Sequence, residues 1–119
     1  MQNLTANEWV LNPHQSNLPS SAAGTTITFT KAGALSGAGP CNSYRGGFTL
    51  DGPIIAIRNV STTFKSCGPQ IMSAEHLYLQ ALESVHTVAP THRDELKLTG
   101  ASNLVLVYEA HVLREPSKG

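Results

Sequence analysis

Hydrophobic and polar residues alternate along most of the chain, which is the pattern of β-strands that bury one face. The clearest case is residues 25–31, where a face of Thr and Lys alternates with Ile27 and Phe29. Turn signals such as Ala32-Gly33 and Asp51-Gly52 separate these segments. The pattern predicts strands at 8–11, 25–31, 34–37, 44–50, 53–60 continuing into 62–64, 87–89, 95–98 and 104–108.

Only one stretch changes to the period of a helix. Its apolar residues recur at intervals of three and four, at Leu77, Tyr78, Ala81, Leu82 and Val85. Ser73 is the expected N-cap, and Glu75 would lie in the first turn, where the helix dipole favours an acid. We therefore predict a helix from Gln70 or Ser73 to Val85.

About eight short strands and one helix predict a mainly β fold of the α+β class. The expected architecture is a small antiparallel β-barrel, closed or nearly closed, with the α-helix packed on it. With 119 residues the chain is expected to form one domain, with a core at about 4–110 and a tail at 111–119. Trp9 is expected to fill the core from the first strand, and residues 12–24 read as a loop.

The composition narrows the choice of partners. Charged residues make up 13% of the chain and the formal net charge is zero, so the basic surface of a nucleic-acid binder is missing. No run of about 18 apolar residues occurs, so no transmembrane segment is predicted. The expected partner is a protein or a small ligand, and a monomer is the expected state.

Residues 37–48 hold four of the ten glycines and Cys41, which predicts a tight connection between strands. Cys41 and Cys67 each have Gly or Pro beside them, and no Cys-x-x-Cys motif occurs. This pattern favours a Cys41–Cys67 disulfide and an oxidising compartment, with two buried thiols as the alternative.

The two cysteines and five histidines are the candidate catalytic and metal-binding residues of the chain. A cysteine nucleophile would need a nearby base, but no pairing follows from the spacing of the histidines, which are His14, His76, His86, His92 and His111. A site made of His86, His92 and a cysteine lacks a recognisable ligand spacing. We therefore predict no catalytic residue, no metal and no cofactor.

Two polar residues remain in the glycine-rich segment. Asn42 is expected to lock a tight turn by bonding neighbouring backbone groups, with ligand contact as the alternative. Arg45 is expected to be a solvated side chain, with a role in a recognition surface as the alternative.

Several short motifs follow one another in an order that resembles the META domain family, the HslJ-like proteins of bacterial envelopes. Trp9 stands in the opening strand, and Gly39 precedes the motif Cys41-Asn42-Ser43-Tyr44-Arg45-Gly46, in which a Cys-Asn pair is followed by an aromatic residue and a glycine. Thr63 is followed four residues later by Cys67. Pro40 departs from the pattern, because a glycine or small residue is expected before the cysteine.

The resemblance implies a non-enzymatic envelope domain with a stress-related binding or structural role. It also implies a periplasmic, outer-membrane-associated or secreted location, with the signal or lipoprotein segment absent from this chain. Gly39, Asn42, Tyr44, Gly46, Thr63 and Trp9 would be structural residues of the motif. An alternative is a small secreted protease inhibitor that presents residues 12–24 or 37–47 from a rigid barrel. A carrier of lipid or small molecules would instead need a hollow barrel.

Overall fold

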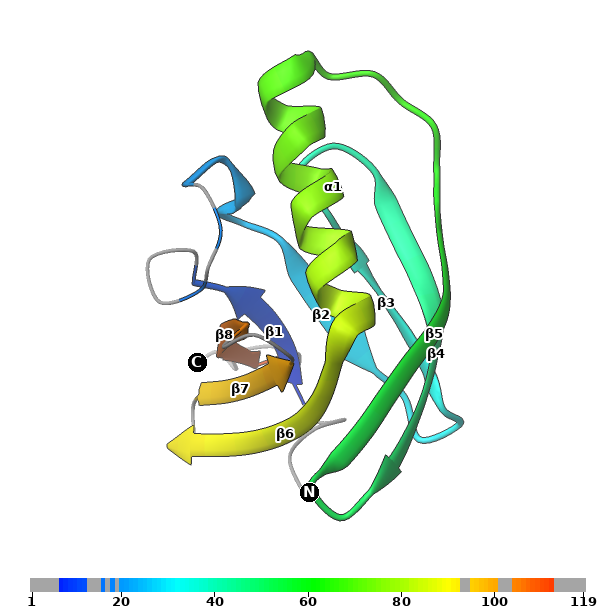
Figure 1. Ribbon diagram of the computed structural model, residues 1–119, viewed down its shortest axis with the longest axis vertical. Coiled ribbons are helices and arrows are strands. Elements are labelled where there is room, and N and C mark those ends of the chain that lie inside the picture. Colours follow the sequence, from blue (N-terminus) through cyan, green and yellow to red (C-terminus); the bar gives the residue numbers. More distant parts are fainter. Residues whose placement is uncertain are drawn as a thin grey trace, which may run out of the picture.

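The computed structural model describes residues 7–12, 16, 18, 20–92, 95–100 and 104–112 (Figure 1). The strands are β1 (Asn7–Leu11), β2 (Thr26–Phe29), β3 (Ala34–Ala38), β4 (Ser43–Asp51), β5 (Ile54–Thr62), β6 (Val85–His92), β7 (Glu95–Gly100) and β8 (Val105–Val112). A 3-10 helix, η1 (Ser20–Ala22), lies between β1 and β2, and α1 (Pro69–Ser84) lies between β5 and β6.

The strands form a closed antiparallel barrel in which each strand pairs with its neighbours in sequence order. Pairing of β1 with β8, from Asn7 opposite Val112 to Leu11 opposite Tyr108, completes the circle. The predicted mainly β barrel with one helix is therefore confirmed. Closure removes the exposed edges that an open sheet of these strands would have, except along β5, which pairs with β6 only at Ile54 among the described residues.

Alternation along the strands fills the barrel with side chains. In β2, Ile27 and Phe29 are buried while Thr26 and Thr28 face outward, as the pattern of hydrophobic residues predicted. Trp9 from β1 is 2% exposed and belongs to the same core cluster. Three tyrosines, Tyr44, Tyr78 and Tyr108, also contribute to this cluster.

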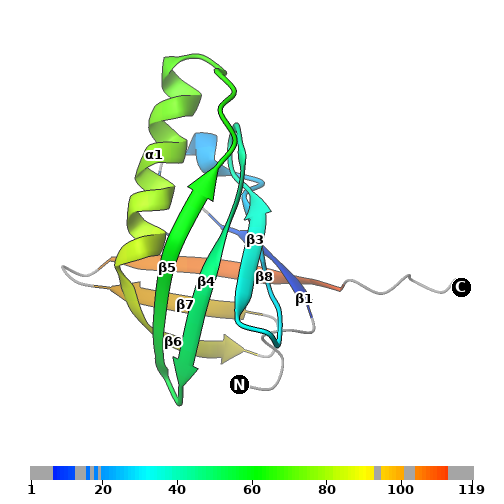
Figure 2. The same cartoon turned by 90° about the vertical axis from the view of Figure 1, so that its right-hand side faces the viewer.

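One junction of the barrel has very little strand pairing. β4 and β5 form a long hairpin, whereas β5 and β6 share only the pair Ile54 and Thr87 among the described residues. Val88 adds one backbone hydrogen bond to the Pro53 oxygen, at 2.8 Å. The helix α1 connects these two strands in sequence and lies beside β5 (Figure 2).

The helix starts at Pro69, one residue before the first predicted start, Gln70, and four residues before the second, Ser73. Gly68 precedes it with a positive φ of 96°, and Pro69 occupies its first turn. The N-cap expected at Ser73 is therefore wrong, because Gly-Pro starts the helix and proline tolerates the first turn, which needs no N–H donor. Glu75 consequently lies beyond the first turn, on the face that packs against the barrel. Leu77 is 44% exposed because it lies about 100° around the helix from the buried Tyr78.

Two further expectations need correction. The predicted strands on either side of the glycine-rich connection each start or end one residue further into it, since β3 ends at Ala38 and β4 begins at Ser43, so 37–47 is not the single loop expected of an inhibitor. β5 ends at Thr62 instead of continuing to Phe64, so the alternation of buried and exposed residues does not extend to that aromatic side chain.

Parts of the expected loop at 12–24 and of the expected tail at 111–119 lie outside the described residues, and β8 extends to Val112. No described helix has the length and apolar character needed to cross a membrane.

Candidate functional site

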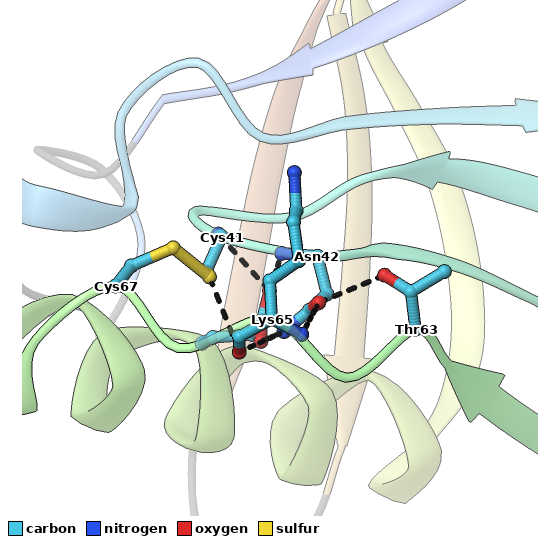
Figure 3. Close-up of a disulfide and its surroundings, with 6 residues drawn as sticks. Cys41, Asn42, Thr63, Lys65 and Cys67 are labelled. Carbon is cyan, nitrogen blue, oxygen red and sulfur yellow. Dashed lines mark hydrogen bonds between the residues drawn. A yellow bond between two sulfur atoms is a disulfide. The ribbon is translucent and has the colours of Figure 1, made fainter.

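The loop from Thr63 to Gly68 joins β5 to α1, is held by side-chain hydrogen bonds and a disulfide, and is called the clasped loop below. Asn42 lies beneath it with only 4% of its surface exposed. Its Oδ1 accepts hydrogen bonds from the Thr63 hydroxyl at 2.8 Å and from the Lys65 backbone N–H at 2.6 Å. Its Nδ2 donates to the Lys65 carbonyl oxygen at 3.2 Å (Figure 3). One amide therefore holds the chain on both sides of Phe64.

Asn42 is itself held by Glu75 from α1. The Glu75 carboxylate is 4% exposed and accepts three hydrogen bonds, from the backbone N–H groups of Cys41 and Asn42 and from Asn42 Nδ2. Gly39 packs against this carboxylate, since a Cβ at Gly39 would lie 2.8 Å from Glu75 Oε2. A buried carboxylate is stable in this position because N–H donors replace its lost contacts with water.

A disulfide closes the other side of the clasped loop. Cys41 and Cys67 are joined, with their Cα atoms 5.9 Å apart, so the predicted pairing is confirmed and the alternative of two thiols is excluded. Cys41 Sγ also lies 3.6 Å from the Lys65 carbonyl oxygen. This approach, dashed in Figure 3, is a contact without a proton, because a disulfide sulfur carries no hydrogen.

A second polar network connects the same helix and strand deeper in the barrel. Tyr44 follows Asn42 by two residues, and Tyr78 follows Glu75 by one turn of α1. The Tyr44 hydroxyl lies 2.7 Å from that of Tyr78, which lies 2.9 Å from that of Tyr108. Tyr44 also donates to the Thr26 carbonyl oxygen at 2.6 Å.

The carbonyl sets the direction of the whole tyrosine chain. A carbonyl oxygen only accepts, so the single proton of Tyr44 points to Thr26. Tyr78 must then donate to Tyr44, and Tyr108 must donate to Tyr78. Burial is the main cause that raises the pKa of all three hydroxyls well above 10, and repulsion from Tyr108 adds to the rise for Tyr44 and Tyr78. The three groups are therefore neutral donors at neutral pH.

A polar groove lies beside the clasped loop on the outer face of the barrel. Its volume is about 650 Å³. Side chains that bear hydroxyl groups line much of it, together with Glu8 and Arg45; they include Thr26, Thr28, Ser36, Ser43, Ser61, Thr62 and Thr63. Gly37 forms part of the wall, where a Cβ would come within 1.9 Å of the Thr26 carbonyl oxygen. This glycine is needed for close packing of β3 on β2.

The structure brings most of the motif residues of the sequence together. Gly39, Asn42 and Thr63 surround Glu75, and Tyr44 belongs to the tyrosine chain. Gly46 lies in β4, where a Cβ would be 3.0 Å from the Arg58 carbonyl oxygen. Trp9 lies in the core of the barrel. It is not part of the clasp, by which we mean Asn42, Glu75 and the Cys41–Cys67 disulfide with the bonds by which they hold the clasped loop.

The histidines, which were the other candidates for a catalytic or metal site, are not brought together in a site by the described part of the structure. His76 and His86 are exposed, His14 lies outside the described residues, and nothing is described of the His92 and His111 side chains. Within the described ranges, no group of three or more His, Cys, Asp or Glu is arranged to hold a metal ion.

Sequence reasoning missed two important residues. Glu75 was expected in the first turn, as an acid favoured by the helix dipole, yet it shares a helical stripe with Tyr78 and Leu82, which is the available signal for a buried acid. Phe64 was assigned to a strand, although Gly68-Pro69 and the small polar residues before it favour an irregular segment.

Comparisons with known proteins place this geometry in a family. The META domain model matches residues 2–112. A structure solved by NMR of a protein from Burkholderia xenovorans is 23% identical, covers 92% of this chain and 85% of its own, and has a TM-score of 0.69. A second NMR structure is 21% identical, with coverage of 96% and 97% and a TM-score of 0.69.

A crystal structure of a DUF4847 family protein from Bacteroides vulgatus ATCC 8482 is 14% identical, with coverage of 94% and 96% and a TM-score of 0.66. At these identities the likeness concerns the fold alone. A comparison with curated proteins gave no match. Because the family model spans nearly all of the sequence, including both cysteines and the whole clasp, this chain belongs to the META domain family.

Proposed function

We propose that this META domain is a non-enzymatic binding domain of an oxidising compartment outside the cytoplasm, and that it binds a protein partner through the clasped loop. The observation that carries the proposal is Phe64, which is 97% exposed between two residues held by Asn42. An exposed aromatic side chain on a fixed backbone binds without first losing backbone entropy.

The disulfide supports the proposed location. Structural disulfides form and persist in secreted proteins and in the periplasm, and this one fastens the loop that we assign to binding. Because both cysteines are joined, neither is a thiolate nucleophile. The stress-related role implied by the family resemblance is part of the proposal, with the clasp keeping the binding loop in shape.

The packed core argues against a carrier function. Side chains from the strands and α1, among them Trp9, Phe29, Tyr78 and Leu98, form one buried cluster inside the barrel. A lipid would have to displace this cluster.

Photo-crosslinking tests the proposal directly. A benzoyl-phenylalanine at position 64 keeps an aromatic side chain at the exposed site, and the same residue at Leu77 on α1 is the matched control. In periplasm-targeted protein we expect a discrete protein adduct from position 64 that Asn42→Ala removes. An adduct pattern equal at both positions, or none at position 64, would contradict the proposal.

The groove favours a second candidate function, the binding of a small polar ligand. Its hydroxyl groups and Arg45 suit a ligand that carries hydroxyls and a carboxylate. Calorimetric titration with a uronic-acid disaccharide tests this candidate. Binding that Arg45→Ala abolishes would support it, and the absence of heat would remove it for this ligand class.

A further inference from the structure

The clasped loop is exposed along its whole length, so a binding cleft of another protein could accommodate it. All residues from 63 to 70 are exposed, and no turn or bend interrupts 63–68. Figure 1 shows this green segment extending from the end of β5 to the start of α1. Among the described residues, Phe64 is far more exposed than the other large exposed apolar side chains, Ile54 at 53% and Leu77 at 44%. An aromatic side chain that is fully exposed on a fixed backbone is available to a partner as an anchor residue.

The peptide bond between Phe64 and Lys65 lies in a stretch of chain that is held on both sides. Thr63 before it and Lys65 after it bond the same oxygen of Asn42, and Cys67 is tied to Cys41. Asn42 in turn rests on the buried Glu75. The main chain around Phe64 is therefore extended, exposed and fixed, which are the properties that a protease cleft selects in a tightly bound inhibitor.

We propose that the clasped loop inhibits a serine endopeptidase by occupying its active-site cleft in the manner of a substrate, with Phe64 in an apolar specificity pocket. The inference rests on the proposed function, in which this loop is the surface that binds a protein. A single large aromatic residue between small or flexible polar neighbours, Thr63, Lys65 and Ser66, fits an enzyme that reads one side chain in a hydrophobic slot. This loop replaces residues 12–24 and 37–47, the inhibitory loops expected from the sequence.

The clasp explains why such a loop would inhibit the protease without being hydrolysed as a substrate. Attack of the protease serine oxygen on the Phe64 carbonyl carbon would form an ester and break the bond to the Lys65 nitrogen, with the serine proton passing through the enzyme's histidine to that nitrogen. The new amine would stay in place, because Asn42 bonds Lys65 and the disulfide holds Cys67. It can then attack the ester, return the proton and release the serine, which restores the original peptide bond without water entering.

Inhibition assays with α-chymotrypsin, a subtilisin and trypsin test the proposal on the whole chain. We expect the wild-type protein to inhibit chymotrypsin or subtilisin at submicromolar concentration and to stay intact by mass spectrometry. Phe64→Ala should weaken this inhibition by about 100-fold or more, as the loss of a central aromatic anchor does. Leu77→Ala, the matched control on α1, should leave it unchanged.

Two further variants separate inhibition from general binding. Phe64→Lys should transfer inhibition to trypsin, whose pocket carries an aspartate. Asn42→Ala, kept folded by the disulfide, should be cut after Phe64 and become a substrate. A folded wild-type protein that inhibits neither chymotrypsin nor subtilisin, or that is cut rapidly after Phe64, overturns the inference. If the adduct at position 64 still forms and contains no protease, only this inference fails and the proposed function stands.

Discussion

Two polar networks join α1 to the start of β4, and they differ in how their hydrogen bonds are arranged. In the clasp, several donors converge on one carboxylate, Glu75, and the network supports an exposed loop. In the tyrosine chain, neutral hydroxyls follow one another inside the barrel and end at a carbonyl. Loss of the Glu75 carboxylate breaks three bonds of the first network at once, whereas loss of Tyr108, the donor end of the tyrosine chain, breaks one bond of the second. The two networks should therefore respond very differently to single substitutions.

The largest effect is expected from Glu75→Ala. It leaves three N–H donors without their acceptor, and at about 1–3 kcal/mol for each unsatisfied buried group the unfolding free energy should fall by about 4 kcal/mol. Urea denaturation measures the change, with Glu83→Ala on the exposed side of α1 as the control. A loss below about 1 kcal/mol would show that water replaces the carboxylate.

The second largest loss of unfolding free energy is expected from removal of the disulfide by the double substitution Cys41→Ala and Cys67→Ala. The two cysteines are 26 residues apart, and release of a loop of this length should cost about 3.5 kcal/mol. Denaturation curves of the double variant and of the wild type, each with and without reductant, measure the cost. Reductant should destabilise only the wild type; an equal response of both proteins would contradict the assignment.

Alkaline pH should act on the tyrosine chain and leave the clasp unaffected. The folded pKa values lie well above the unfolded value of 10, so the unfolded state loses its protons first and stability falls as the pH rises above 10. The fall should be about 1 kcal/mol for each tyrosine between pH 10 and 11, or about 3 kcal/mol in all.

Absorbance at 295 nm follows this titration. Because all three tyrosines of the chain are buried, their ionisation should coincide with unfolding measured by circular dichroism. Ionisation near pH 10 in the folded protein would contradict the burial of the chain.

The smallest effect is expected from Tyr108→Phe. Tyr108 stands at the donor end of the chain, so its loss should cost about 1 kcal/mol. Tyr44→Phe should cost about twice as much, because it removes both the donor to Thr26 and the acceptor for Tyr78. Chemical denaturation at pH 7 ranks the two variants, and equal costs would argue against the assigned direction.

The fold could be predicted to a large extent from the sequence. Strands such as Thr26–Phe29 alternate between a polar and an apolar face, and this alternation is a local signal that burial of one face enforces. The disulfide could also be inferred, because only two cysteines occur and no redox motif accompanies them.

The clasp could be predicted only in part, because its interactions join segments far apart in the sequence. Asn42 was expected to bond neighbouring residues, but its partners Thr63, Lys65 and Glu75 lie 21 to 33 residues away. The exposure of Phe64 was missed because a hydrophobic residue after a strand is normally read as part of that strand. β5 ends at Thr62, the Thr63 N–H still bonds the Ser43 oxygen, and Asn42 then holds Thr63 and Lys65 by contacts that no local pattern contains.

The weak junction between β5 and β6 gives α1 a further importance. Beyond Ile54, no described residue of β5 pairs with β6, so most of this nine-residue strand has one side without a strand neighbour. The helix runs along this side (Figure 2). A bare strand edge is a template on which a second molecule can add its own strand. By covering this edge, α1 prevents self-association of the protein. A variant in which the helix is loosened should therefore aggregate under conditions in which the rest of the barrel is still folded.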